Sequence, residues 1–168
     1  MRFLSSDESH TLDQSIRHQF RSVADRPRVE LCYASGQKDY APAARLIAQA
    51  AGTFSEAAVL FSFCMTGDGW LEHNRADPGW QTYRQWRKNL GETRRLYDAP
   101  GHLAESGEIE HLSRVIEFAL ILGWDAMVTA KPGRNLLFLS HDDRLDVMVG
   151  FEARTLAKKL LKLGYWSS

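Results

Sequence analysis

The densest group of potentially reactive side chains is the segment 140–144, which reads Ser-His-Asp-Asp-Arg. A histidine beside two carboxylates can bind a divalent metal ion or transfer protons. A further group from elsewhere in the chain, such as Asp68, His73 or Asp125, would be needed to complete a site. One hypothesis is therefore a small metal-assisted hydrolase, with its metal bound by His141, Asp142, Asp143 and Asp68.

A tight turn between two strands explains the same segment without any metal. Aspartate accepts hydrogen bonds from the backbone of its own turn, so Asp142 and Asp143 suit such a position. The spacing of His141 and its neighbours matches no recognised metal-ligand pattern. We therefore favour the turn and keep the metal site as the alternative.

A second candidate group is the pair Trp124-Asp125, which directly follows the glycine expected to end a helix. An aromatic ring and a carboxylate at the start of a strand can line a ligand pocket. The alternative is a packed Trp124 and an Asp125 that bonds to the turn backbone. If the strands 124–130 and 135–140 form a hairpin, Asp125 lies close to His141.

Residues 75–98 are rich in positive charge and aromatic rings, which suggests contact with nucleic acid. The three aromatic residues Trp80, Tyr83 and Trp86 share one helical face with Leu90, however, and this spacing is typical of core residues. We therefore expect the rings to be buried and nucleic-acid binding to be a weaker hypothesis. Its candidate contacts are Arg84, Arg87 and Lys88, within a basic set that also includes Arg75, Arg94 and Arg95.

The remaining sequence carries no recognised catalytic or cofactor motif. There is no phosphate loop, dinucleotide fingerprint or nucleophile elbow, so no cofactor is expected. Cys32 and Cys64 have no close Cys or His companion, which predicts free thiols in a reducing compartment. The 168 residues carry no net charge, which disfavours attraction of the whole protein to nucleic acid or to a membrane. The most apolar stretch, 118–124, is far shorter than the roughly 20 residues of a membrane span. These features predict a cytoplasmic protein.

The elements that would position these residues follow from periodicity and capping signals. A capping box at Thr11 predicts the start of the first helix, and Pro42 and Asp77-Pro78 predict the starts of the next two. The apolar run 57–65 predicts a central strand. Further predicted elements are a strand at 29–33, a hairpin at 66–71, a helix from 109 to Gly123, strands at 124–130, 135–140 and 144–149, and a helix at 151–163 that buries Leu156, Leu160 and Leu163. Residues 93–107 give no firm assignment.

This order of elements predicts a single α+β domain over residues 1–168. It has a mixed or antiparallel sheet that includes a C-terminal three-stranded meander, and about five helices that cover one side of it. Because catalytic motifs are absent, we expect a non-catalytic binding protein. Its partner would be a protein or a small ligand, held at a cleft near the meander and its residues Trp124, Asp125, His141, Asp142 and Asp143. The metal-assisted hydrolase and the nucleic-acid-contacting module stay as alternatives.

Overall fold

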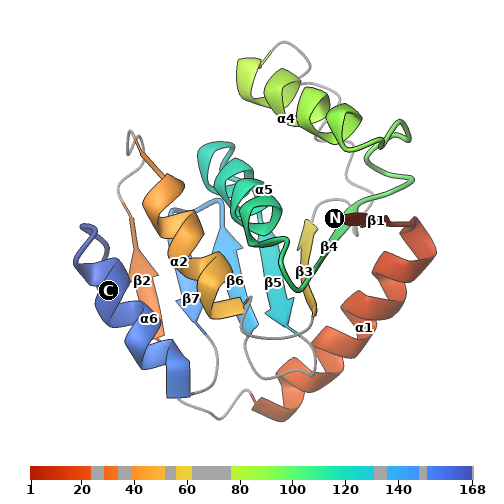
Figure 1. The fold of residues 1–168 in the computed structure, drawn as a ribbon. Coiled ribbons are helices and arrows are strands. Elements are labelled where there is room, and N and C mark those ends of the chain that lie inside the picture. The colour runs from red at the N-terminus through yellow and green to blue at the C-terminus, as the bar shows by residue number, and fades with distance from the viewer. Residues whose placement is uncertain are drawn as a thin grey trace.

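The computed structural model describes residues 1–23, 29–33, 39–51, 56–61, 77–130, 136–147 and 151–167. These residues form five helices and eight strands (Figure 1). The helices are α1 (Ser6–Val23), α2 (Ala41–Ala51), α4 (Pro78–Asn89), α5 (Ile109–Ile121) and α6 (Phe151–Leu161). The strands are β1 (Arg2–Leu4), β2 (Val29–Cys32), β3 (Glu56–Phe61), β4 (Gly101–Glu105), β5 (Ala126–Ala130), β6 (Leu136–Ser140), β7 (Arg144–Val147) and β8 (Trp166–Ser167).

All eight strands belong to one sheet, in the order β1-β4-β3-β5-β6-β7-β2-β8. Every neighbouring pair is antiparallel, and β5, β6 and β7 form the C-terminal meander. The predicted α+β class, antiparallel sheet and meander are therefore confirmed.

Strand β3 lies inside the sheet between β4 and β5, as its apolar run predicts. Leu60 and Phe61 are both fully buried. Because side chains alternate along a strand, they enter different cores. Phe61 joins the large core with α2 and α5, whereas Leu60 packs with Ile16 of α1. Helices thus cover both sides of the sheet, and the prediction of one-sided cover is wrong because β3 is apolar on both faces.

Helix α1 begins earlier than the sequence prediction. The capping box forms at Ser5 and Glu8: the Ser5 backbone N–H donates to Glu8 Oε2 over 2.8 Å, and the Glu8 N–H donates to Ser5 Oγ over 3.2 Å. The backbone hydrogen bond from Ser5 is the largest of the effects that lower the pKa of Glu8 to about 2. The alternative box at Thr11 is not used, because Thr11 lies within the helix and its hydroxyl donates to the Asp7 carbonyl.

Strands β1, β4 and β8 were not expected from the sequence. Strand β4 lies in the stretch 93–107, where Pro100 and Gly101 are typical of a loop. In the fold, a Cβ atom at Gly101 would lie 2.6 Å from Ser9 Oγ and 2.9 Å from Leu60 Cδ2. This glycine is therefore needed for close packing between α1 and the sheet rather than for a turn.

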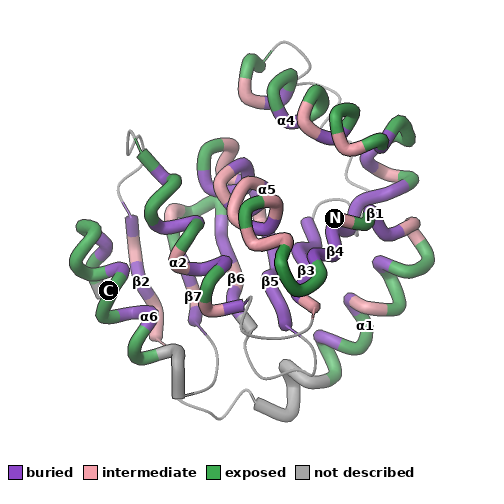
Figure 2. The backbone as a smooth tube through the Cα atoms, viewed as in Figure 1, coloured by how far each residue is buried: buried purple, intermediate pink, exposed green. Residues whose placement is uncertain are grey.

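The last helix is shorter than expected. It ends at Leu161, and Leu163 is 36% exposed rather than buried, while Leu156 and Leu160 are buried as predicted. Figure 2 shows that the strands are mostly buried and that the helices keep an exposed outer side. No helix among the described residues is long and apolar enough to cross a membrane. The expected hairpin at 66–71 lies outside the described residues.

Candidate functional site

Helix α4 positions the aromatic and basic residues of the segment 77–98. The Asp77 carboxylate caps its first turn by accepting from the N–H groups of Gly79 and Trp80 over 2.6 and 3.1 Å. Pro78 occupies the first turn, where its missing N–H costs nothing. The helix packs against α5, beside β1 and β4 (Figure 1). The predicted start of this helix is confirmed.

The aromatic face of α4 is part of the core. Tyr83 is fully buried and meets Phe118 of α5 edge-on, at a ring-centroid distance of 5.3 Å. Trp80 is 7% exposed and lies 5.3 Å from Trp124. The interpretation of these rings as core residues is therefore confirmed for Trp80 and Tyr83, while Trp86 is half-buried.

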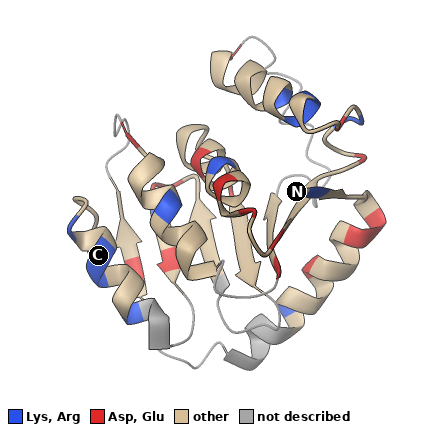
Figure 3. Ribbon diagram, viewed as in Figure 1, with Lys and Arg blue, Asp and Glu red and all other residues tan. Residues whose placement is uncertain are grey.

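Beside this face, α4 and the following segment enclose a pocket of about 150 Å³. The C-terminal half of α4 and that segment contain Lys and Arg residues, which are blue in Figure 3. The pocket is lined by Trp80, Tyr83, Arg84, Arg87, Lys88, Glu92, Thr93, Arg94, Arg95, Leu96 and Tyr97. Five of these side chains are cations, and one is a carboxylate.

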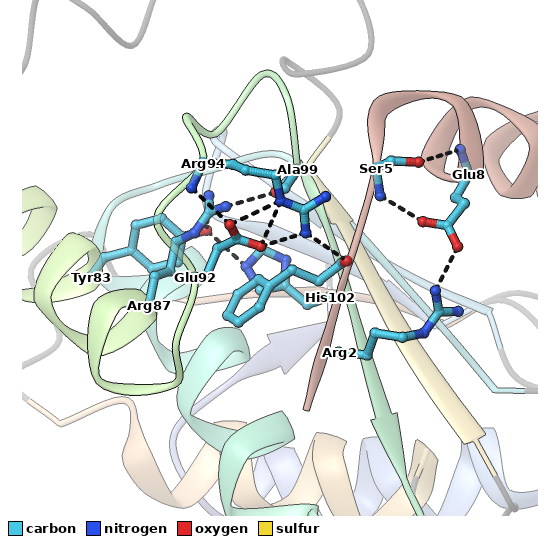
Figure 4. A network of polar contacts seen from close by, with 10 residues as sticks. Arg2, Ser5, Glu8, Tyr83, Arg87, Glu92, Arg94, Ala99 and His102 are labelled. Atoms are coloured by element: carbon cyan, nitrogen blue, oxygen red, sulfur yellow. Dashed lines mark hydrogen bonds and ion pairs between the residues drawn. The ribbon is translucent and has the colours of Figure 1, made fainter.

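The single carboxylate of the lining, Glu92, is already paired. Arg94 binds it with both arms of its guanidinium: Nε lies 3.0 Å from Oε1 and Nη2 lies 2.6 Å from Oε2 (Figure 4). Burial raises the pKa of Glu92, but the hydrogen bonds and charge of Arg94 and the charge of Arg87 outweigh it, so the net pKa is lowered. Arg94 also donates to the Phe3 carbonyl, which fixes this wall of the pocket to β1.

Arg87 is a buried cation whose hydrogen-bond partners among the described residues are neutral. Its side chain is 4% exposed, Nη1 donates to the Tyr83 hydroxyl over 3.4 Å, and Nη2 donates to the Ala99 carbonyl over 2.9 Å (Figure 4). Its guanidinium carbon also lies 5.0 Å from the centre of the Phe3 ring. No carboxylate of the described residues pairs with it. A buried charge without a counter-ion is costly, so this geometry favours an anion beside it.

His102 of β4 lies behind this cation, fully buried, with Nε2 at 2.8 Å from the Tyr83 hydroxyl. Burial, and secondly the positive charge of Arg87, hold the pKa of His102 well below its usual value. The imidazole is therefore neutral at neutral pH. Because Arg87 can only donate, the Tyr83 hydroxyl accepts from Arg87 and donates to His102 Nε2.

The turn after β6 brings together the residues that the sequence placed there. His141 Nδ1 lies 3.0 Å from Asp125 Oδ1, and the His141 backbone N–H donates to the same carboxylate over 2.7 Å. The predicted approach of Asp125 to His141 is confirmed. Asp143 has a φ of 58°, a conformation that aspartate tolerates in turns. The backbone N–H of Asp142 donates to Ser140 Oγ over 3.2 Å.

These contacts are those of a turn, and within the described residues no group of three His, Cys, Asp or Glu side chains is arranged to hold a metal ion. Asp68 and His73 lie outside the described residues, as does Cys64. Cys32 is a free, half-buried thiol. Trp124 is buried against Phe61 and Trp80. None of the meander candidates lines the pocket.

The structure therefore separates two sets of candidates. Arg84, Arg87 and Lys88, singled out as nucleic-acid contacts, line one pocket. The sequence analysis did not predict the ion pair between Glu92 and Arg94, nor the contact of His102 with Tyr83. A local signal for this ion pair was present, because an acid two residues before an arginine can bond to it. The hydrogen bond from Arg94 to the Phe3 carbonyl of β1, however, is a tertiary contact.

Comparisons of this chain with protein-family models, with curated proteins and with solved structures found no match.

Proposed function

We propose that this protein is a non-catalytic binding protein that holds a small anionic ligand in the pocket between α4 and residues 92–97. The observation that carries the proposal is the charge of the lining: five cationic side chains face a single carboxylate that is already paired with Arg94. The proposal keeps the binding role favoured by the sequence but moves the site from the meander to α4.

The charge of the lining supports this proposal because the protein as a whole carries no net charge, so the cations are concentrated at the pocket. The protein as a whole has 21 basic and 21 acidic residues. Arg84, Lys88 and Arg95 form no ion pair with any described carboxylate. At 4 Å, an anion gains about 1 kcal/mol from one cation in bulk water and about 4 kcal/mol at an effective dielectric constant of 20. Several such cations around one partly enclosed pocket favour an anionic occupant.

The hydrogen-bonding state of the lining supports binding over catalysis. A general base or nucleophile needs a free acceptor. Both oxygens of Glu92 accept from Arg94, and the Tyr83 hydroxyl is shared by Arg87 and His102. The described lining therefore offers cations and donors to a ligand, which is what recognition of an anion requires.

A small ligand fits this pocket better than a nucleic-acid strand. Stacking on bases needs accessible rings, whereas Trp80 and Tyr83 are buried in the core. The pocket is also smaller than the 300–1,000 Å³ typical of sites for drug-sized molecules. These features favour a compact anionic group over an extended polymer.

The test is calorimetric titration with inorganic phosphate and with sulfate at constant ionic strength and pH 7.5. We expect saturable binding by the wild type and a loss of at least about tenfold in affinity in the double variant Arg84→Ala/Lys88→Ala, which is about 1.4 kcal/mol. Both residues are exposed, so the fold should be retained.

A matched control is Lys158→Ala/Lys159→Ala, which removes two exposed cations from α6. This control should bind like the wild type. Absence of saturable binding, or an equal loss in both double variants, would show that the pocket does not hold an anion.

A further inference from the structure

We infer that the ligand presents a terminal phosphate monoester in its dianionic form. This inference rests on the proposed anion site and adds the chemical class of the group that enters it. It follows from three properties of the lining: the burial of Tyr83 and Arg87, the predominance of hydrogen-bond donors and the excess of positive charge.

The inner end of the pocket is formed by buried residues and the mouth by exposed ones. Arg87 is 4% exposed and Tyr83 is fully buried, and behind them lies the fully buried His102. Arg84 and Lys88 are exposed one turn apart on α4. We therefore expect a group that reaches Arg87 to be the end of a molecule. A phosphodiester within a strand continues on both sides and would meet the buried residues around Arg87.

The polar atoms that the pocket offers are mainly donors. Arg87 uses two of its five N–H groups on Tyr83 and Ala99. Trp80 lines the pocket, and its buried indole N–H has no hydrogen-bond partner among the described residues, so we assign this donor to the ligand. The oxygens of Glu92 are taken by Arg94. A complementary ligand group is rich in acceptors and has no need to donate, as is true of a fully deprotonated oxyanion.

The excess charge distinguishes a dianion from a monoanion. A phosphate monoester carries three acceptor oxygens and nearly two negative charges above its second pKa of about 6. A carboxylate carries two oxygens and one charge, which leaves more of the cations unmatched. Beside the cations, Leu96 and Tyr97 of the lining supply apolar surface for the organic part next to the phosphate. The geometry thus fits a small phosphorylated molecule.

The experiment compares three probes of nearly equal shape by calorimetry at constant ionic strength. Phenyl phosphate is a dianion at pH 7.5, phenyl sulfate is a monoanion, and methyl phenyl phosphate is a monoanionic diester. At pH 7.5 we expect phenyl phosphate to bind at least about tenfold tighter than phenyl sulfate, because its second charge meets several cations. The diester should bind no tighter than phenyl sulfate.

The pH dependence gives a second readout. At pH 5 phenyl phosphate carries one negative charge, so the ratio of its affinity to that of phenyl sulfate should fall toward one. The groups around the ligand are Arg84, Arg87 and Lys88 from α4, Glu92, Arg94 and Arg95 from the next segment, and His102 from β4. Phenyl sulfate reports any titration of these groups, so the ratio of the two affinities isolates the charge of the phosphate.

A variant tests the donor argument directly. Trp80→Phe keeps an aromatic ring and removes the indole N–H. The affinity for phenyl phosphate should fall by about tenfold, which corresponds to the loss of one hydrogen bond to a charged group. Trp166→Phe, at an exposed position on β8, should leave the affinity unchanged.

The outcomes separate the inference from the proposed function. If phenyl phosphate and phenyl sulfate bind with equal affinity at pH 7.5, and both lose binding in Arg84→Ala/Lys88→Ala, the pocket is an anion site but has no preference for a dianion. This result would overturn the inference and leave the proposed function standing. A diester that binds as tightly as the monoester would overturn the terminal group. No saturable binding of any probe would overturn the proposed function itself.

Discussion

The hydroxyl of Tyr83 lies 2.8 Å from Nε2 of His102, and both side chains are fully buried. Arg87 donates to the same hydroxyl, so the buried cation of the pocket is tied to β4 of the sheet through Tyr83. The guanidinium is therefore held in place before any ligand arrives. Such preorganisation reduces the cost of binding.

Replacing Tyr83 by Phe removes the hydroxyl that His102 and Arg87 share. We expect a loss of about 1–3 kcal/mol in the free energy of unfolding, because two buried polar groups lose their partner. Urea unfolding measures this loss. The matched control is Tyr165→Phe, since the Tyr165 hydroxyl is buried without a hydrogen-bond partner in the described chain and its removal should cost nothing. Equal costs in the two variants would contradict the network.

His102 should remain neutral across the physiological range. Burial, aided by the charge of Arg87, lowers its pKa in the folded protein, whereas the unfolded chain has a pKa near 6.5. Below that pH the unfolded state binds the extra proton, so stability is complete above pH 6.5 and falls as the pH drops, by up to about 1.4 kcal/mol per pH unit. In an NMR titration, the midpoint for the His102 ring should lie well below pH 6.5. A midpoint near 6.5 would contradict the account.

The pKa of His141 is shifted in the direction opposite to that of His102. The hydrogen bond from its ring to Asp125, and then the charge of Asp125, raise its pKa above the ordinary value. Its contribution to stability is therefore present below the unfolded pKa and is lost as pH rises through the folded pKa. By NMR titration, Asp125→Asn should lower the pKa of His141 markedly. Asp142→Asn should lower it less, because Asp142 has the smaller effect. Equal effects of the two variants would refute the assignment of Asp125 as the main partner.

The turn at Asp143 predicts how substitutions there behave. Because φ is 58°, Asp143→Asn should be nearly neutral, whereas Asp143→Val should cost about 1–2 kcal/mol, the penalty for the left-handed conformation. Thermal unfolding, with and without zinc, manganese or magnesium, checks both effects. A rise in melting temperature with metal in the wild type that disappears in Asp143→Asn would instead support the metal site.

The elements with strong local signals were predictable from the sequence. The apolar run of β3 and the Asp77-Pro78 start of α4 both correspond to elements in the structure. Strand β4 was not predictable, because the need for a glycine at position 101 arises from the close approach of Ser9 and Leu60, which are distant in sequence. The start of α1 was misplaced because the sequence contains two capping boxes, and local rules do not rank them.

The candidate site was predictable only in part. The spacing of Arg84 and Lys88, one helical turn apart, shows that they share a face. Their place in a pocket depends on Arg94, which pairs with Glu92 and also bonds to the Phe3 carbonyl some 90 residues away in sequence. Contacts of this kind are set by the tertiary fold, and no local pattern reports them.

We propose that an anion occupies the pocket beside α4, and Trp80 is a lining residue whose indole N–H can be followed by NMR. The measurement is an NMR titration of the tryptophan side chains with inorganic phosphate at constant ionic strength, with the Trp80 signal assigned from Trp80→Phe. We expect a saturable shift of the Trp80 signal, since Trp80 lines the pocket, and little change at the exposed Trp166. A saturable shift at Trp166 with none at Trp80, or no saturable shift at either, would contradict it.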